Sequence, residues 1–414
     1  MATRLVVDEA RLWRRLMRSA EIGAVGATGL GRLALSDDDR SVRDWFVTEA
    51  EALGCWVQVD AAGNIFAGYP GSRPDLPPIA MGSHLDSQPT GGRFDGVLGV
   101  LAGLEVVQSL AEHGVRTRHP LVVVDWTNEE GCRFAPAMTG SGAFAGRFAL
   151  DYVYGLTDRS GKRFDEELVR IGYKGSALAA PQRFAGYFEL HIEQGPVLET
   201  EGLEIGVVTG VQGMRWFDVE FSGDCCHAGT TPMALRRDPV PAVAAFLAEV
   251  NAIGDMDRGR SLCTVGLLEA APGSRNTVPQ SVRLSVDLRH PDDGMLDRME
   301  ARLVEVGAEM AGRFNIDHAI ARRWNSPPVT FDARAVAAVS GAVRKLCLSH
   351  REMVSGAGHD AVHVAAVAPT AMIFVPCQGG ISHNPRESIT SGQAASGANV
   401  LLQALLDYDE METP

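Results

Sequence analysis

An apolar run, a glycine-rich turn and an apolar segment with helical spacing follow one another between residues 77 and 107. The run at 77–80, extended by Gly82 and Ser83, predicts a short buried strand, and the spacing within Val97–Val107 predicts a helix. The continuous apolar run Pro120–Trp126 has the composition of a buried parallel strand. Together the three segments predict a βαβ unit, which requires a parallel sheet covered by helices.

Three side chains that can bind metal lie at the carboxyl end of the first predicted strand. His84 and Asp86 form an H-x-D pair, and Asp95 lies in the glycine-rich turn before the helix. Ligands of open α/β sheets gather at the carboxyl ends of strands, and an imidazole with a carboxylate suits a borderline divalent ion. A histidine held by a neighbouring carboxylate is also ordinary structure, so the H-x-D pair alone leaves both interpretations open.

Two adjacent glutamates, Glu129 and Glu130, follow the second predicted strand of the unit. Because successive side chains diverge, one of them can bind metal while the other faces a substrate. A solvated acidic turn is the alternative for such a pair. The position of the pair after a buried strand, in the same unit as His84, favours the site.

Two more histidines follow strand-like segments further along the chain. The alternating segment Tyr187–Glu193 carries His191, and His383 lies in the loop after the apolar run Thr370–Val375. Both are therefore expected at strand ends, where ligands gather.

The candidate ligands are nitrogen or oxygen donors at strand ends: His84, Asp95, Glu130, His191 and His383. Two divalent ions that share one bridging carboxylate fit this set and leave positions for water and substrate. With Asp95 as the bridge, one ion takes His84 and His191. The other ion takes Glu130 and His383, and Glu129 is left as the general base that moves the proton of water to a leaving nitrogen.

Bulk properties limit the classes of function. The chain has 414 residues, 45% of them apolar, and a net charge of −14. No Lys/Arg-rich tract is present, so neither nucleic acid nor an anionic membrane is an expected partner. The N-terminal residues lack the apolar core of a secretion signal, and seven scattered cysteines without C-x-x-C spacing argue against a disulfide framework. A cytoplasmic location is therefore expected.

The pattern of elements changes in the middle of the chain. Residues 214–326 read as strand, helix, two strands, helix and strand, which predicts an inserted α+β domain with a four-stranded sheet and two helices on one face. The fold class expected is α/β with two domains. Residues 1–213 and 327–414 form a catalytic domain with a mixed, mostly parallel sheet, and 214–326 form a lid or dimerisation domain.

The chain resembles the amidases of the hydantoinase/carbamoylase family, in the M20 peptidase clan. That group contains N-carbamoyl-L-amino acid hydrolases, β-ureidopropionases and allantoate amidohydrolases. The matching segments run in the family's order from about residue 80 to residue 390 and read GSHLDSQPTGGRFDGVLGVLAGLE, TNEEGCRFAPAMTGSGAFAG, HIEQGPVLE, CHAGTTPMALRRDP, PGSRNTVPQ with DLRHPD, SGAGHDA and ISHNPRE.

The resemblance implies roles for further residues. It makes Glu129 the acid/base and Asp86 the partner that orients His84, and it implies a homodimer formed through the inserted domain. Around the substrate it places Gln194, His227, Asn276, Arg289 and His359. Arg289 is the candidate for a substrate carboxylate, because a guanidinium binds a carboxylate with two parallel hydrogen bonds. A surface salt bridge is the alternative for this arginine.

The expected reaction is metal-dependent removal of the carbamoyl group from an N-carbamoyl amino acid, of the L-α or β-alanine type. Zn²⁺, Mn²⁺, Co²⁺ and Ni²⁺ all suit the donor set. One rival is an allantoate or other ureido-acid amidohydrolase, and a farther one is an aminoacylase or dipeptidase of the same clan. A rival of another class is a metal-binding protein on the same fold that has no turnover. Two segments depart from the usual sequence of the family: Asp224-Cys225-Cys226, just before His227, and Gln88-Pro89-Thr90. Because of these departures, the identity of the substrate stays open.

Overall fold

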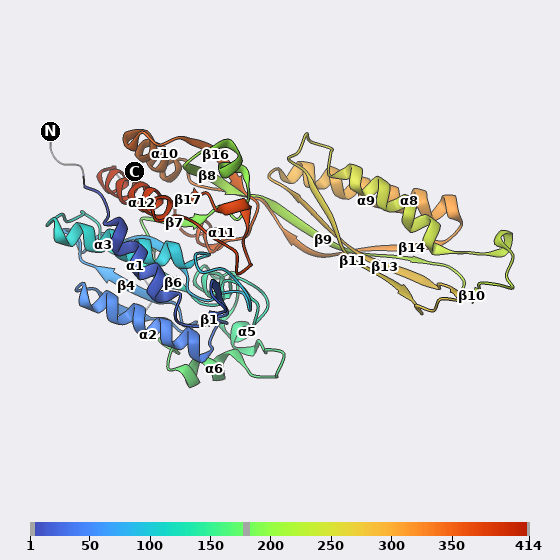
Figure 1. Cartoon of the computed structure of the whole chain (residues 1–414), viewed down its shortest axis with the longest axis horizontal. Helices are drawn as coiled ribbons and strands as arrows, with labels where there is room; N and C mark the ends of the chain where they lie inside the picture. Colours follow the sequence, from blue (N-terminus) through green and yellow to red (C-terminus); the bar gives the residue numbers. More distant parts are fainter. Residues whose placement is uncertain (1–4, 177–182, 412–414) are drawn as a thin grey trace. The chain divides into compact units, whose positions relative to one another are not determined.

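The computed structural model describes residues 5–176 and 183–411. These residues form two compact units, one from 1–210 with 330–414 and one from 211–329 (Figure 1). Each unit has its own hydrophobic core and is described by itself. Within the described ranges, no helix combines the length and the hydrophobicity that crossing a membrane requires.

A mixed sheet runs through the first unit. In the described part of the chain it has nine strands in the order β15-β8-β17-β7-β5-β6-β4-β3, with β16 paired to β8. The pairs β17–β7, β7–β5 and β5–β6 are parallel, whereas β8, β4 and β3 pair antiparallel with their neighbours. The predicted mixed, mostly parallel sheet is confirmed. Its strands are β3 (Trp56–Val59), β4 (Ile65–Tyr69), β5 (Ile79–His84), β6 (Leu121–Trp126), β7 (Gly186–Ile192), β8 (Ile205–Val211), β15 (Val329–Thr330), β16 (His350–Ser355) and β17 (Thr370–Val375).

The predicted βαβ unit is present as β5, helix α3 (Val97–Glu112) and β6, with the two strands parallel and adjacent. Helix α3 lies close to the sheet because glycines face it. A Cβ on Gly99 would lie 2.5 Å from the carbonyl oxygen of Leu190, and one on Gly103 would lie 2.9 Å from Val123. This close packing fixes the height of the turn that precedes the helix.

Helices cover both faces of this sheet. One face of the sheet, which includes the side chain of Val123, is covered by a layer of packed helices, α1, α3, α10 and α12. Helices α4 and α11 pack against each other on the opposite face. There Phe144 of α4 contacts Trp126, with 5.1 Å between the ring centroids. The Ser36 side chain accepts the N–H of Asp39 at the start of α2. The other helices of this unit are α1 (Glu9–Ser19), α2 (Asp37–Ala52), α4 (Thr139–Phe144), α5 (Leu150–Gly155), α6 (Phe164–Ile171), α7 (Val197–Glu201), α10 (Ala333–Leu346), α11 (Ala361–Val364) and α12 (Ser391–Glu410).

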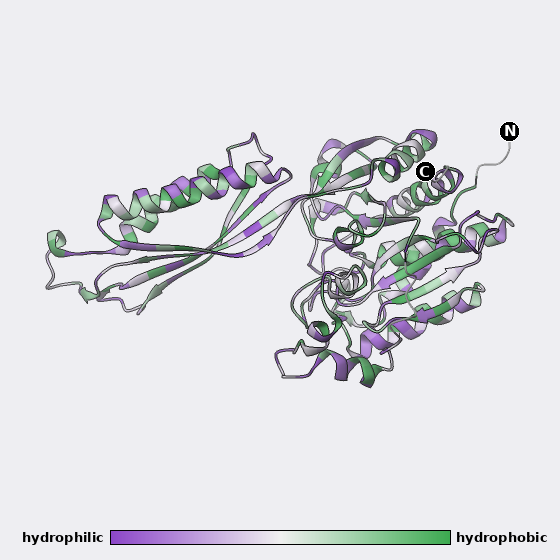
Figure 2. Cartoon of the chain, turned by 180° about the vertical axis from the view of Figure 1, so that it is seen from behind, coloured by the Kyte–Doolittle hydropathy of each residue, from purple (hydrophilic) through white to green (hydrophobic). Residues whose placement is uncertain are grey.

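The second unit is an antiparallel sheet in the order β11-β13-β9-β14, with helices α8 and α9 packed against it. Helix α9 mixes apolar and polar residues along its length (Figure 2), as expected of a helix that buries one side, whereas α8 is mostly apolar. The predicted four-stranded sheet with two helices is confirmed. Its elements are β9 (Gly213–Ser222), β10 (Cys226–His227), α8 (Pro239–Ile253), β11 (Leu262–Ala271), β12 (Thr277–Val278), β13 (Ser281–His290), α9 (Asp293–Phe314) and β14 (Asp317–Ser326).

Some short elements escape the sequence patterns. Strand β16 (His350–Ser355) pairs only at the margin of the sheet, and its sequence HREMVS is too polar to stand out as an apolar run. The two-residue strands β1 (Ala24–Val25) and β2 (Gly29–Leu30) are shorter than any window in which a period can be detected.

Candidate metal centre

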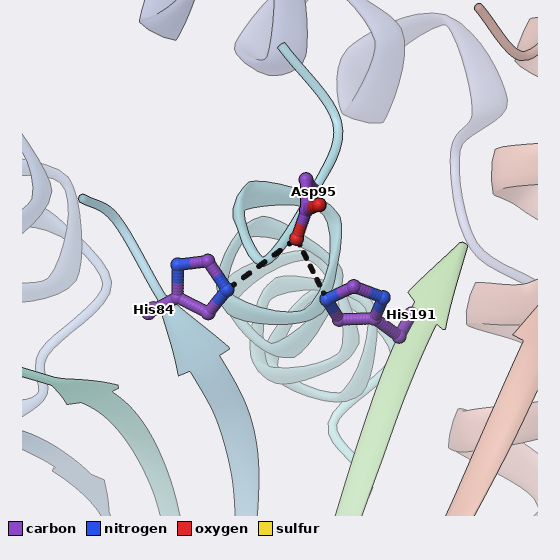
Figure 3. A group of neighbouring side chains, drawn as sticks. All are labelled: His84, Asp95 and His191. Atoms are coloured by element: carbon purple, nitrogen blue, oxygen red, sulfur yellow. Dashed lines mark ion pairs between the residues drawn. The ribbon is translucent and has the colours of Figure 1, made fainter. Parts of the chain in front are cut away.

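Two histidines and one aspartate meet at the carboxyl ends of β5 and β7. His84 ends β5, His191 lies near the end of β7, and Asp95 lies in the turn before α3 (Figure 3). The Asp95 Oδ1 is 3.1 Å from the Nε2 of His191 and 3.5 Å from the Nε2 of His84. All three residues are buried, and their ligand atoms lie within 4.8 Å of one another.

Backbone carbonyls orient both imidazole rings. The Nδ1 of His84 lies 2.9 Å from the carbonyl oxygen of Asp86, and the Nδ1 of His191 lies 2.9 Å from that of Ile192. A carbonyl oxygen can only accept, so in the neutral ring each Nδ1 carries the proton and each Nε2 keeps a lone pair. The N–H of Gly96 points at the Nε2 of His191 at 3.1 Å, which agrees with this tautomer. Nitrogen lone pairs therefore face Asp95 from both sides.

Gly96 allows helix α3 to begin beside the ring of His84. Its φ is +66°, and a Cβ at this position would lie 2.3 Å from the Nε2 of His84. Both the left-handed backbone and the lack of space require glycine. The turn can thus bring Asp95 against the imidazole without obstruction.

A second group shares Asp95 with the first. The Nε2 of His383 lies 3.4 Å from the Oδ2 of Asp95 and 3.4 Å from the Oε2 of Glu130. Gln88 holds the other side of the Glu130 carboxylate, with its backbone N–H 3.1 Å from Oε1 and its amide nitrogen 2.5 Å from Oε2. His383 is half exposed at this side of the site. Asp95 therefore offers one oxygen to each group.

Asp86 shapes the turn that carries the two glutamates. Its Oδ1 accepts the N–H of Glu129 at 3.1 Å and its Oδ2 accepts the N–H of Glu130 at 3.3 Å. The resemblance implied that Asp86 orients His84. In the structure the backbone carbonyl oxygen of Asp86 takes the Nδ1 proton of His84, and its nearest carboxylate oxygen is 3.9 Å from that nitrogen. The Asp86 carboxylate instead binds the backbone of the turn that carries the two glutamates.

The protonation of this cluster shows how strongly its groups depend on one another. Burial lowers the pKa of His84, but the charges of Glu129 and other carboxylates outweigh it and hold that pKa well above its usual range. Burial, with the nearby carboxylates, raises the pKa of Glu129 well above its usual range and that of Glu130 to about 7. The hydrogen bond to Asp95 raises the pKa of His383 to about 9.

These residues fit divalent ions. Buried carboxylates need a counter-charge, and a bound cation supplies one and stabilises their ionised form. Three imidazole nitrogens with carboxylate oxygens form the borderline donor set that Zn²⁺, Mn²⁺, Co²⁺ and Ni²⁺ accept. The described residues give two overlapping triads around Asp95, which are His84, Asp95 and His191, and Asp95, Glu130 and His383.

Gln194 and His359 lie beside the triads. The Gln194 amide nitrogen donates to the Oδ2 of Asp95 at 2.7 Å, and the His359 ring packs on the ring of His191 at 4.6 Å between centroids. The Nε2 of His359 is 2.9 Å from the Ser355 hydroxyl. Burial, with the charge of His191, lowers the pKa of His359 well below its usual range. A neutral imidazole is thus maintained next to the site.

His227 and Asn276 lie together within the second unit. Strand β10 pairs with β12 so that His227 is opposite Thr277, and the N–H of Ala228 donates to the carbonyl oxygen of Asn276 at 2.9 Å. The Nδ1 of His227 accepts the N–H of Gly229 at 3.1 Å and that of Thr230 at 3.2 Å. In the neutral ring the proton is therefore on Nε2, on an exposed side chain that can donate outward.

Arg289 is the last residue but one of β13 in the second unit and pairs with Asp287 on the same strand. Its Nη2 lies 2.8 Å from the Oδ2 of Asp287, and its Nε also contacts both carboxylate oxygens. The salt bridge considered as the alternative is thus present. The guanidinium is also about one-third exposed, at 29% of its side chain. Three of the predicted substrate contacts, His227, Asn276 and Arg289, belong to the second unit, whereas Gln194 and His359 belong to the first.

Sequence reasoning missed three residues that hold the ligands: Gln88, Ser382 and Glu387. Gln88 binds Glu130, and the Ser382 hydroxyl donates to the Oδ2 of Asp95 at 2.8 Å. Glu387 accepts the backbone N–H of Asp95 at 3.1 Å. Their one sequence signal is position, since all three lie within five residues of a predicted ligand or its partner. Polar residues near a ligand are too common for that signal to single them out.

Comparison with known proteins places the chain in a family. The model of peptidase family M20/M25/M40 matches residues 80–407. The N-carbamoyl-L-amino-acid amidohydrolase of Rhizobium meliloti is 45% identical over 405 residues, which cover 98% of this chain and 97% of the relative. The ureidoglycolate hydrolase of Arabidopsis thaliana is 32% identical over 412 residues, which cover 97% of this chain and 87% of the relative.

Solved structures agree with the sequence comparison. The crystal structure of an amidase of the hydantoinase/carbamoylase family from Burkholderia multivorans matches with a TM-score of 0.95 and 48% identity, covering 99% of this chain and 100% of the other. The match extends over both units. The chain therefore belongs to peptidase family M20/M25/M40, and its structural neighbours are hydantoinase/carbamoylase amidases.

Proposed function

We propose that this protein is an N-carbamoyl-L-amino acid amidohydrolase that uses two divalent ions. The observation that carries the proposal is the position of Asp95, which is shared by two triads of ligand atoms, with Glu129 beside them. The N-carbamoyl-L-amino-acid amidohydrolases of Rhizobium meliloti and Geobacillus stearothermophilus, at 45% and 38% identity, support the substrate class.

The first triad would hold one ion through His84 and His191, and the second would hold the other through Glu130 and His383, with Asp95 between them. When bound, the ions supply a Lewis acid and a water molecule that ionises near neutral pH. The chain's own residues then move protons and hold the substrate. Zn²⁺, Mn²⁺, Co²⁺ and Ni²⁺ are all compatible with these donors.

Glu129 is the proton carrier in this proposal. Its Oε2 lies 3.6 Å from the Nε2 of His84, so it borders the first triad, where water and the ureido carbonyl would meet. Its carboxylate would take the proton of the attacking water and deliver it to the nitrogen that leaves. Burial raises its pKa, which suits a group that must both accept and return a proton.

We also propose roles for the five substrate contacts that the resemblance implies. The exposed Nε2–H of His227 is suited to donate to the oxygen that becomes negative when water adds to the carbonyl. Asn276 lies beside it, and Arg289 would bind the carboxylate of the amino acid. Gln194 and the neutral His359 would border the substrate in the first unit. The resemblance to family members that pair through this domain supports a homodimer in which His227 serves the site of the partner.

A second candidate substrate is another ureido acid. The ureidoglycolate hydrolases of Arabidopsis thaliana and Oryza sativa, each 32% identical to this chain, favour it, because a ureido group next to a carboxylate is common to both substrate classes. A cytoplasmic location is part of the main proposal, since all seven cysteines are free thiols, the form that a reducing compartment maintains.

The test is ammonia release from N-carbamoyl-L-amino acids, N-carbamoyl-β-alanine, allantoate and ureidoglycolate, each at several concentrations. We expect the highest kcat/KM with N-carbamoyl-L-amino acids. Treatment with a chelator should abolish the activity, and Mn²⁺, Co²⁺, Ni²⁺ or Zn²⁺ should restore it. Preference for ureidoglycolate or allantoate would replace the main proposal with the second one, and full activity after complete metal removal would reject both.

A further inference from the structure

A carboxylate outside the predicted ligand set forms part of the wall of the metal centre. Glu387 lies before helix α12 and is buried, with 2% of its surface exposed. Its Oε1 accepts the N–H of Phe94 at 2.9 Å and the N–H of Asp95 at 3.1 Å. These are consecutive N–H groups of the glycine-rich turn. One oxygen from the C-terminal part of the chain thus fixes the backbone that carries the shared ligand.

A hydroxyl links the same two carboxylates through their side chains. The Ser382 Oγ lies 2.8 Å from the Oδ2 of Asp95 and 3.3 Å from the Oε2 of Glu387. A hydroxyl has one proton, and the shorter distance assigns it to Asp95. Asp95 is therefore held at its backbone by Glu387 and at its side chain by Ser382 and Gln194.

The turn leaves space for Glu387 by having no side chain at Gly92. A Cβ on Gly92 would lie 2.1 Å from both the Cδ and the Oε1 of Glu387, and 2.4 Å from its Cβ. Such distances are far shorter than any van der Waals contact. The glycine at this position and the glutamate some 300 residues later in the chain therefore fit together as a pair.

Burying a carboxylate costs folding free energy unless hydrogen bonds or an opposite charge compensate it. An apolar side chain could fill the same space, but the N–H groups of Phe94 and Asp95 would then lose their acceptor. Asp95 belongs to both triads, so a shift of this turn misplaces a ligand of both ions. Groups that orient metal ligands typically contribute 10–100-fold to metal affinity.

We propose that Glu387 is a positioning residue that sets the affinity of both metal ions by holding the turn of Asp95. The proposal rests on the two-ion function above. Glu387 acts through Asp95 and has no role as a proton carrier. It differs in this from Glu129, which lies among the ligands themselves.

The experiment compares three variants of the full-length protein. Glu387→Ala removes the acceptor, and Glu387→Gln keeps an oxygen that can accept both N–H groups. Asp409→Ala is the matched control, because Asp409 is also buried and accepts two consecutive N–H groups, those of Arg118 at 2.7 Å and His119 at 2.8 Å, away from the metal centre. Affinity for Mn²⁺ and Zn²⁺ is measured by competition with a chromophoric chelator, and thermal unfolding is measured in excess chelator.

We expect Glu387→Ala to bind metal about 10–100-fold more weakly than the parent. Glu387→Gln should recover most of that loss, and Asp409→Ala should bind metal like the parent even if it is less stable. Unchanged affinity in Glu387→Ala, or an equal loss in Asp409→Ala, would overturn the proposal. If the parent binds only one ion, the two-ion function fails but this test stands, because Asp95 belongs to either triad.

Discussion

The Oε2 of Glu129 lies 3.6 Å from the Nε2 of His84, the same nitrogen that lies 3.5 Å from Asp95. The adjacent Glu130 lies in the other triad, with His383. The side chains of two neighbouring residues in one turn thus contact different parts of the site. The Asp86 carboxylate accepts hydrogen bonds from both of their backbone N–H groups. This division of roles can be tested directly.

We expect Glu129→Gln to keep both metal ions but to lower kcat by about 10²–10⁴-fold, the usual contribution of a positioned acid/base. Glu130→Gln should instead lower metal occupancy, because it removes a charged ligand. Elemental analysis of the purified variants, together with single-turnover rates, separates the two effects. If Glu129→Gln lost metal while Glu130→Gln kept it, the two roles would have to be exchanged.

Arg289→Ala should raise KM for substrates that carry a carboxylate by about 10–100-fold, since hydrogen bonds between charged groups contribute about 1.5–3 kcal/mol. Arg283→Ala is the matched control, because Arg283 lies on the same strand, β13, and pairs with Glu220 at 3.1 Å. A substrate whose carboxylate is replaced by a carboxamide should not distinguish Arg289→Ala from the parent. Equal kinetics of both variants with the carboxylate substrate would leave Arg289 with a structural role, as in its salt bridge to Asp287.

Mixed dimers test whether His227 acts on the site of the partner. Homodimers of Glu129→Gln and of His227→Ala should each be nearly inactive, and loss of an oxyanion donor alone lowers kcat by about 10²–10³-fold. A mixed dimer would contain one site with an intact Glu129 from one chain and an intact His227 from the other. Co-expressed and co-purified mixed dimers should regain activity through that site. No recovery would mean that His227 does not act on the partner.

His363 makes stability depend on pH. Burial, with the charge of Arg147, lowers its pKa from 6.5 to about 4, and its ring packs against Phe148 at 5.6 Å between centroids. As the pH falls below 6.5 the unfolded chain takes up the proton first, so stability is lost between pH 6.5 and about 4. From about pH 7 to about pH 5 this loss is on the order of 2 kcal/mol.

The corresponding measurement is chemical unfolding in excess chelator at the two pH values. In His363→Gln the decrease in unfolding free energy between them should be smaller than in the parent by that amount. His113→Gln, at an exposed position at the end of helix α3, serves as the control and should follow the parent. A pH dependence of His363→Gln equal to that of the parent would contradict the assignment.

The sequence predicted those parts of the site that follow strongly patterned strands. His84, Glu130 and His191 each follow an apolar or alternating run, and the end of a parallel strand is where such ligands gather. The pairing of ligands around Asp95 could also be predicted, since the number of donors limits how two ions can share them. The βαβ unit and the four-stranded insertion were predicted for the same reason, because their periodicity is strong.

Other features depend on contacts that no local pattern encodes. The carboxylate of Asp86 has two possible partners, the ring of His84 and the N–H groups of the glutamate turn, and only the backbone path decides between them. Glu387 contacts a turn nearly 300 residues away in sequence, and a single chain gives no sign of such a pairing. Strand β16 has a polar sequence, and it forms a strand because it pairs with β8 and not because of a pattern of its own.

The order of the ligands along the chain has a consequence for how the protein matures. His84, Asp95 and His191 are all synthesised before His383 and Glu387, and almost 200 residues separate His191 from His383. A nascent chain that ends after β17 contains the first triad but lacks the residue that completes the second and the one that holds Asp95. Completion of the second triad therefore has to wait for the segment after β17, whereas every residue of the first triad is made before that strand.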